Sequence, residues 1–217
     1  MIKLYKRPKP DVLASNQNKW TTELMQYVYQ DREIPDHIQG RYRNMEIKKE
    51  VIAETYGKCA YCESYVTHQY PGDIEHIIPK SVYPRLTFTW NNLSFVCYWC
   101  NNNKRAKIDK TCKLLNPYKD EIGEHLRAFG PLILHINNSK RGELTHKEIK
   151  LNRKELLERR IDAINEFRTL LDKYEREPEG ALKDVLLREI EDSAANDKEF
   201  SCILHQFLND NGTLRTN

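Results

Sequence analysis

The chain has 217 residues, a formal net charge of +3, and 39% apolar against 31% charged residues. This length allows one good core or two small ones, and the composition is not polar enough to indicate disorder. No window approaches the ~18 consecutive apolar residues of a membrane span, and the opening MIKLYKRPKPD contains no apolar secretory signal. We therefore expect a cytoplasmic globular protein with no membrane association.

Residues 1–57 are predicted to form a basic arm followed by helices. Four basic residues open the chain, namely Lys3, Lys6, Arg7 and Lys9. Apolar residues recur at helical spacing over residues 18–30, and a second helical stretch runs from Met45 to Tyr56. Gly57 follows it as a natural C-cap.

Four of the six cysteines form two pairs, which are Cys59-x-x-Cys62 and Cys97-x-x-Cys100. In a cytosolic chain this pattern indicates metal or redox chemistry rather than disulfides. Four soft thiolates favour zinc and leave no open coordination position, so the expected ion is structural. Cys112 and Cys202 stand alone, and we expect both to pack in the interior. Residues 58–113 are therefore predicted to be a zinc-stapled module.

A short strand is predicted inside this module, in GDIEHIIPKS at residues 72–81. Asp73 and Glu75 alternate with Ile74, and Pro79 ends the pattern. A neutral imidazole such as that of His76 can accept a proton from water if a neighbour fixes its tautomer. Because consecutive strand residues point to opposite faces, Glu75 and His76 can serve one site only if the strand bends.

The segment NNLSFVCYWCNNNK supplies two further candidate residues, Asn92 and Asn101. Asn101 directly follows the last zinc cysteine, so the zinc would hold it at a fixed position relative to the strand. Carboxylate and amide oxygens are hard donors that suit Mg²⁺ or Mn²⁺. A catalytic divalent ion could therefore lie between Glu75 and Asn101, with Asp73 as a third candidate ligand. Basic residues nearby could hold a phosphate backbone, namely Lys80, Lys104, Arg105 and Lys107.

The last part of the chain, residues 114–217, begins with an irregular segment in which LRAFGPLILHINN predicts a strand or hairpin. Helical periodicity then returns from Leu156 to Tyr174 and stops at Pro178 and Gly180. Two shorter helices follow. These helices could simply pack on the central module or could dock a partner protein. The expected fold class is α+β and mainly helical.

The motifs in residues 59–104 resemble the HNH nuclease family, which has a ββα-metal fold. The resemblance implies that Glu75 is a metal ligand, His76 the general base, Asn92 the residue that orients the base, and Asn101 the last ligand. Asn91 is a near rival, but Leu93 follows Asn92 as in the family pattern. Many members have His where this chain has Asn101, and the HNH domain of RNA-guided CRISPR nucleases makes a similar replacement.

A wider resemblance covers the opening IKLYKRPKPDVL, the stretch ETYGKCAYCE and the later LNRKELLERR. These are similar to the PtuB family of HNH nucleases from Septu-type and retron-associated anti-phage systems. The resemblance implies a defence effector that cleaves nucleic acid together with an ABC-type ATPase, which the C-terminal helices would contact. DNA is the first expectation for the substrate, and RNA, including tRNA, stays open. The alternatives are a non-catalytic zinc-binding module and a stand-alone restriction-type nuclease.

Overall fold

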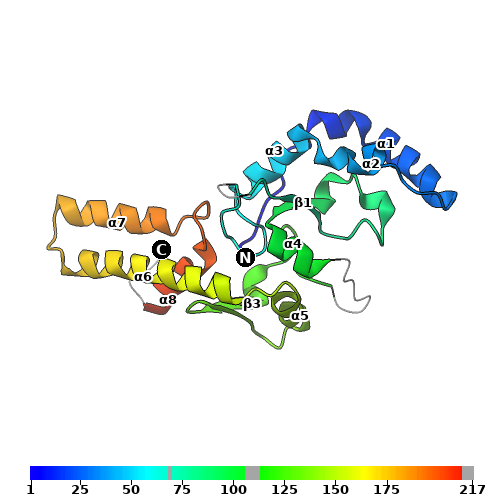
Figure 1. The fold of residues 1–217 in the computed structure, drawn as a ribbon. Coiled ribbons are helices and arrows are strands. Elements are labelled where there is room, and N and C mark those ends of the chain that lie inside the picture. The colour runs from blue at the N-terminus through cyan, green and yellow to red at the C-terminus, as the bar shows by residue number, and fades with distance from the viewer. Residues whose placement is uncertain (68–69, 106–112, 212–217) are drawn as a thin grey trace.

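The computed structural model describes residues 1–67, 70–105 and 113–211 (Figure 1). Its helices and strands, with the 3₁₀ turns labelled η, follow in chain order: α1 (Asp11–Tyr29), α2 (Asp36–Gln39), η1 (Gly40–Arg43), α3 (Met45–Glu54), β1 (Asp73–His76), η2 (Pro84–Leu86), η3 (Trp90–Asn92), β2 (Leu93–Val96), α4 (Tyr98–Lys104), η4 (Ile122–Glu124), β3 (Leu126–Phe129), β4 (Leu132–His135), α5 (Lys140–Glu148), α6 (Lys154–Arg176), α7 (Ala181–Ser193) and α8 (Ser201–Asn211). Among the helices of these ranges, none has both the length and the apolar character needed to span a bilayer.

The centre of the fold is a ββα unit built from β1, β2 and α4. The two strands pair antiparallel, with Asp73 opposite Val96 and His76 opposite Leu93, and α4 follows β2 after one residue. All four residues of β2 are buried, as expected of a strand that packs on both faces. The predicted fold class, an α+β chain that is mainly helical with a ββα module and a four-cysteine cluster, is confirmed.

The polar face of β1 lies against α4. Asp73 accepts a hydrogen bond from Asn101, and Glu75 forms an ion pair with Lys104, one helical turn further along. This arrangement follows from periodicity, because residues two apart on a strand and three apart on a helix share a face. His76 belongs to the opposite face of β1, where its ring contacts Tyr42 of η1. The strand thus separates the two carboxylates from the imidazole, as the alternation predicted.

The basic arm is fastened to the body of the protein. The Lys6 ammonium lies 4.1 Å from the ring centre of Trp90 and 4.4 Å from that of Tyr118, and it pairs with Glu54 at 2.9 Å. Further ion pairs join the arm to the body, among them Lys3–Glu121 and Arg7–Glu50. Lys3, Lys6 and Arg7 therefore each pair with an acidic residue of the chain itself.

The C-terminal region follows the predicted order of a hairpin and then helices. β3 and β4 pair antiparallel, and α6 and α7 run side by side away from the ββα unit (Figure 1). With α8 they enclose a second apolar cluster: Phe167, Leu171, Ile190, Ala194, Leu204 and Leu208. Because this cluster is separate from the main core, α6 and α7 form a projecting arm.

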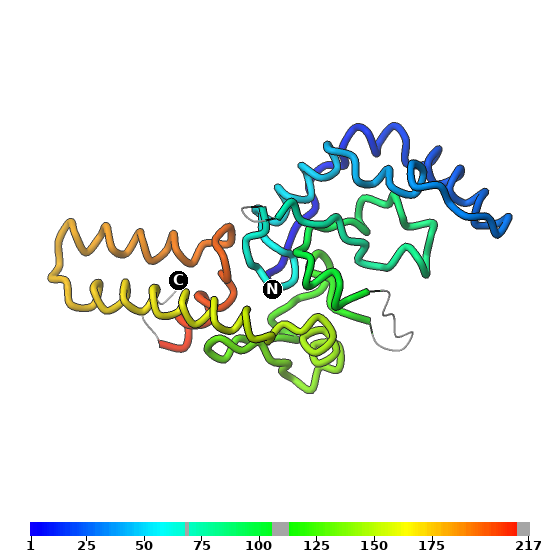
Figure 2. Tube along the Cα trace, viewed as in Figure 1, coloured from blue at the N-terminus to red at the C-terminus, as the bar shows by residue number. Residues whose placement is uncertain are grey.

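The loop that carries the first cysteine pair packs on the segment between α7 and α8, as the chain trace shows (Figure 2). The buried Lys58 ammonium donates to the carbonyls of Asn196 and Lys198 at 2.6 and 2.7 Å. Glu63 accepts a hydrogen bond from the Ser201 hydroxyl at 2.8 Å. These buried polar contacts couple the cysteine loop to the C-terminal region, since each would be costly to leave unpaired.

Candidate active site and metal centre

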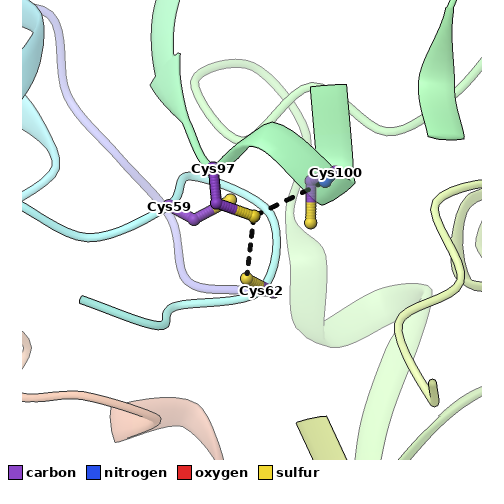
Figure 3. A group of neighbouring side chains, drawn as sticks. All are labelled: Cys59, Cys62, Cys97 and Cys100. Carbon is purple, nitrogen blue, oxygen red and sulfur yellow. Dashed lines mark hydrogen bonds between the residues drawn. The ribbon is translucent and has the colours of Figure 1, made fainter. Parts of the chain in front are cut away.

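The four paired cysteines converge on one point between the loop after α3 and the start of α4 (Figure 3). Their Sγ atoms all lie within 4.8 Å of one another, and those of Cys62 and Cys97 are 3.8 Å apart. Zinc–sulfur bonds of ~2.3 Å in a tetrahedron also place the sulfur atoms about 3.8 Å apart. The donor set therefore fits a zinc ion with four protein ligands and no position open to substrate.

Arg153, which directly precedes α6, lies beside these sulfur atoms. Its guanidinium nitrogens are 3.7 Å from Sγ of Cys100 and 3.9 Å from Sγ of both Cys62 and Cys97. A zinc ion with four thiolates has a net negative charge, which a guanidinium offsets, and such outer contacts orient the ligands. Motif reasoning did not find Arg153, because it lies 53 residues beyond Cys100 in the chain.

His76 is held in one tautomer. Its side chain is 6% exposed, and its Nε2 lies 3.0 Å from the carbonyl oxygen of Thr87. A carbonyl can only accept, so Nε2 carries the proton and donates, and Nδ1 keeps a free lone pair. Burial lowers the pKa of His76 to about 4, so the ring is neutral at pH 7. A neutral imidazole with a fixed tautomer is suited to act as a general base.

Asn92 does not contact His76. Its Oδ1 accepts from the backbone N–H of Ile78 at 2.8 Å, and its Nδ2 donates to the carbonyls of Ile78 and Leu86 at 2.9 and 3.2 Å. Leu86 precedes Thr87, so Asn92 fixes the loop whose carbonyl orients the imidazole. Orientation of His76 by Asn92 through this loop stays a prediction. Its rival Asn91 is exposed, whereas Asn92 is buried.

Asp73 is the carboxylate that lies next to Asn101. Nδ2 of Asn101 is 3.0 Å from Oδ2 of Asp73, and the Tyr70 hydroxyl donates to the other oxygen at 3.0 Å. The sequence had suggested Asp73 only as a third candidate ligand, after Glu75 and Asn101. The contact with Asp73 is made by the amide nitrogen of Asn101. The Asp73 carboxylate and the Asn101 amide oxygen are hard donors of the kind that Mg²⁺ and Mn²⁺ prefer.

Glu75 is buried and paired with Lys104 instead of Asn101. Burial raises the pKa of Glu75, and the Lys104 ammonium opposes this shift. Lys104 is 2% exposed and also donates to the carbonyl of His76 at 2.9 Å. The Lys104 ammonium therefore faces the interior, and phosphate binding by Lys104 stays a prediction. The sequence showed its charge but not its burial.

A hollow in the surface lies beside Asp73 and Asn101. Its lining residues are Tyr42, Arg43, Lys48, Gly72, Asp73, Ile74 and Asn101. Tyr42, which lines the hollow, also packs edge-on against His76, with 4.5 Å between ring centres. Arg43 and Lys48 bring positive charge to the same place. Neither was predicted, since they come from the N-terminal helices and no motif surrounds them.

Comparison with known proteins identifies this central module. Residues 59–107 match the family model of the HNH endonuclease. The chain contains an HNH domain. It is also similar to the Septu protein PtuB of Bacillus thuringiensis, with 28% identity over 130 residues, which is 59% of this chain and 47% of that protein. The Septu protein PtuB of Bacillus mycoides (strain KBAB4) is 31% identical over 183 residues, which is 70% of this chain and 61% of that protein.

The two resemblances expected from the sequence, to HNH nucleases and to Septu protein PtuB, are thus confirmed. The chain spans about half to three fifths of the length of these curated relatives.

Gly72 shapes the entrance to the first strand of the HNH domain. It has a φ of +66°, and a Cβ at this position would lie 2.2 Å from the ring of Phe95, which is fully buried. Only glycine combines this backbone conformation with so close an approach. Asp73 follows directly, so the packing of Gly72 sets where its carboxylate lies.

The remaining basic candidates of the HNH domain differ in their surroundings. The Lys80 ammonium lies 4.9 Å from the ring centre of Tyr42 and 3.3 Å from Oε1 of Gln39. Arg105 is exposed at the end of α4, where its Nε donates to the carbonyl of Asn102 at 3.2 Å. Lys107 lies outside the described residues. Phosphate binding by Lys80, Arg105 and Lys107 stays a prediction.

Proposed function

We propose that this chain is a metal-dependent endonuclease that hydrolyses phosphodiester bonds of nucleic acid. The observation that carries the proposal is His76, a buried neutral imidazole whose Nε2–H is bound by Thr87. Its free Nδ1 takes a proton from the attacking water. Asn92 acts on this step through the loop that it fixes, because a base must be oriented before it can abstract a proton.

Asp73 and Asn101 are the residues proposed to hold the catalytic metal. They are hydrogen-bonded to each other on the wall of the hollow, and Tyr42, on the same wall, packs against His76. Glu75, on the same strand face, can join them only after the Lys104 ammonium releases its carboxylate. A bound Mg²⁺ or Mn²⁺ would stabilise the charge that develops on the phosphate and on the leaving 3′ oxygen.

Positive side chains around the hollow are proposed to hold the substrate backbone. Arg43 and Lys48 line the hollow itself, and the Lys80 ammonium lies 4.9 Å from the ring centre of Tyr42, which also lines it. Such contacts supply affinity but little sequence information, since every phosphate offers them the same charge. The proposal therefore covers both DNA and RNA.

The biological role proposed for this activity is anti-phage defence with an ABC-type ATPase as partner. The similarity to Septu protein PtuB supports the defence role, and the family resemblance implies the ATPase. The projecting arm offers a surface for contact, with exposed Ile161, Leu182 and Val185. We expect an ABC-type ATPase to co-purify with this chain from its native host, and purification of this chain alone would favour a stand-alone nuclease.

The cleavage assay uses plasmid DNA and total tRNA, with Mg²⁺, with Mn²⁺ or with EDTA. We expect cleavage that requires the divalent ion and that Asn101→Ala lowers by at least about tenfold. Excess Mn²⁺ should restore part of the rate, because mass action compensates for a lost ligand. Asn102→Ala is the matched control, since Asn102 is an exposed neighbour on the same helix.

Two results would contradict this scheme. Cleavage that persists in EDTA would remove the catalytic metal from the mechanism. Nucleic-acid binding without cleavage, in Mg²⁺ or Mn²⁺ and with the co-purified ATPase present, would favour the non-catalytic zinc module.

A further inference from the structure

Three aromatic side chains form an exposed row at the start of α4. The ring centres of Tyr70 and Tyr98 are 6.5 Å apart, and those of Tyr98 and Trp99 are 5.4 Å apart, both edge-on. Tyr70 is 41% exposed, Tyr98 50% and Trp99 59%. We refer to Tyr70, Tyr98 and Trp99 as the aromatic row.

Packing over the zinc site does not explain this row. Tyr61, between the first two cysteines, is 1% exposed and so packs in the interior. Tyr98 and Trp99 lie between the second two cysteines, yet about half of each side chain faces solvent. Contiguous exposed apolar side chains, unlike single ones, often mark an interaction site.

The row adjoins the proposed catalytic residues. The Tyr70 hydroxyl donates to Asp73 at 3.0 Å, and Tyr98 precedes Asn101 by three residues on the same helix. Arg43 and Lys48 line the hollow that Asp73 and Asn101 share. Positive charge and aromatic rings therefore surround the same two ligands, which matches a polymer with a charged backbone and flat bases.

We propose that the aromatic row binds unpaired bases, so that the substrate is single-stranded at the position of cleavage. This inference rests on the proposed nuclease function and adds the substrate class. In a duplex the neighbouring base pairs cover the faces of each base, so a row of rings can stack only on unpaired ones. Every base has such a face, and the row accepts single-stranded DNA or RNA without sequence preference.

The test is equilibrium binding in buffer without added Mg²⁺ or Mn²⁺, which separates binding from catalysis and keeps the structural zinc in place. The probes are fluorescein-labelled DNA and RNA of about 16 nucleotides, each single-stranded and as a duplex of the same sequence, measured by anisotropy. We expect the full chain to prefer the single strands. Trp99→Ala should weaken their binding about five- to one-hundred-fold, and Trp99→Phe should retain most of it. Phe129→Ala is the matched control, because Phe129 is 47% exposed on β3, outside the HNH domain.

Each outcome decides the inference without deciding the nuclease proposal. The inference is supported if the wild type prefers single strands, if Trp99→Ala removes this preference, and if Phe129→Ala keeps it. The single strand that binds more tightly, DNA or RNA, then identifies the polymer. Equal or tighter duplex binding overturns it, as does a Trp99→Ala affinity within about twofold of wild type or an absence of binding to any probe. Cleavage by the wild type in the metal assay would stand in each of these cases.

Discussion

Replacing His76 by alanine is expected to lower the cleavage rate by about one hundred- to ten-thousand-fold, the range for loss of a general base. The physical reason is specific to the position of this side chain. Its Nε2–H is bound by the Thr87 carbonyl, so Nδ1 is the nitrogen that can accept a proton from water. Initial rates on the cleaved polymer, at saturating Mg²⁺ or Mn²⁺, measure the effect.

The control for this substitution is His205→Ala, because His205 is exposed on α8 and lies far along the chain from the HNH domain. It should keep the wild-type rate. His76→Ala should also keep its zinc and its cooperative thermal transition, since His76 is not among the cysteine ligands. Wild-type cleavage by His76→Ala would show that another group activates the water.

The local motifs of the site could be predicted from the sequence, but the groups around them could not. Spacing alone identified the four cysteines, because each pair is three residues apart. Tyr42 and Arg153 reach the site from η1 and from the segment before α6. Only the packing of distant elements brings such residues together, so no pattern near His76 or Cys100 could reveal them.

The burial of individual side chains is the second property that could not be predicted from the sequence. Lys104 and Arg105 are adjacent basic residues, yet one is buried against Glu75 and the other is exposed. Their order along the chain does not distinguish them, because the helix face that meets β1 depends on the tertiary contact. The same contact makes Asp73, rather than Glu75, the neighbour of Asn101.

The helices and hairpins were easier to predict than their arrangement. The apolar period over Leu156 to Tyr174 predicted α6, and the Pro178–Gly180 break predicted its end near Arg176. Nothing in that period indicated that α6 and α7 would enclose a cluster of their own. An amphipathic pattern shows that one face is covered, but it does not show by which element.

Loss of zinc is expected to disable catalysis through α4. This helix has seven residues, whereas isolated helices shorter than ~12–15 residues are marginal in water. Cys97 and Cys100 fix its start, and Asn101 and Lys104 meet β1 further along. Without the ion, four buried thiols would no longer hold the helix to the loop after α3. Asn101 would then lose its position beside Asp73.

Cys62→Ser tests this prediction more cleanly than a change at Cys97. Cys97 also caps α4, because its Sγ accepts from the backbone N–H of Cys100, whereas Cys62 lies in the loop after α3. We expect Cys62→Ser to lose the zinc ion, to melt on the order of 10 °C lower or more, and to lose cleavage. Metal analysis, a thermal melt and the cleavage assay measure these effects.

Two further variants determine whether the zinc ion itself is responsible. Cys202→Ser should keep the metal, because Cys202 lies on α8 outside the four-sulfur cluster. Arg153→Gln keeps all four ligands but removes the guanidinium beside them, so zinc affinity should fall about 10–100-fold, with cleavage unchanged at saturating zinc. If Cys62→Ser retained both zinc and cleavage, the four-thiolate site would be wrong. If it lost zinc but cleaved normally, α4 would be held by its packing on β1 alone.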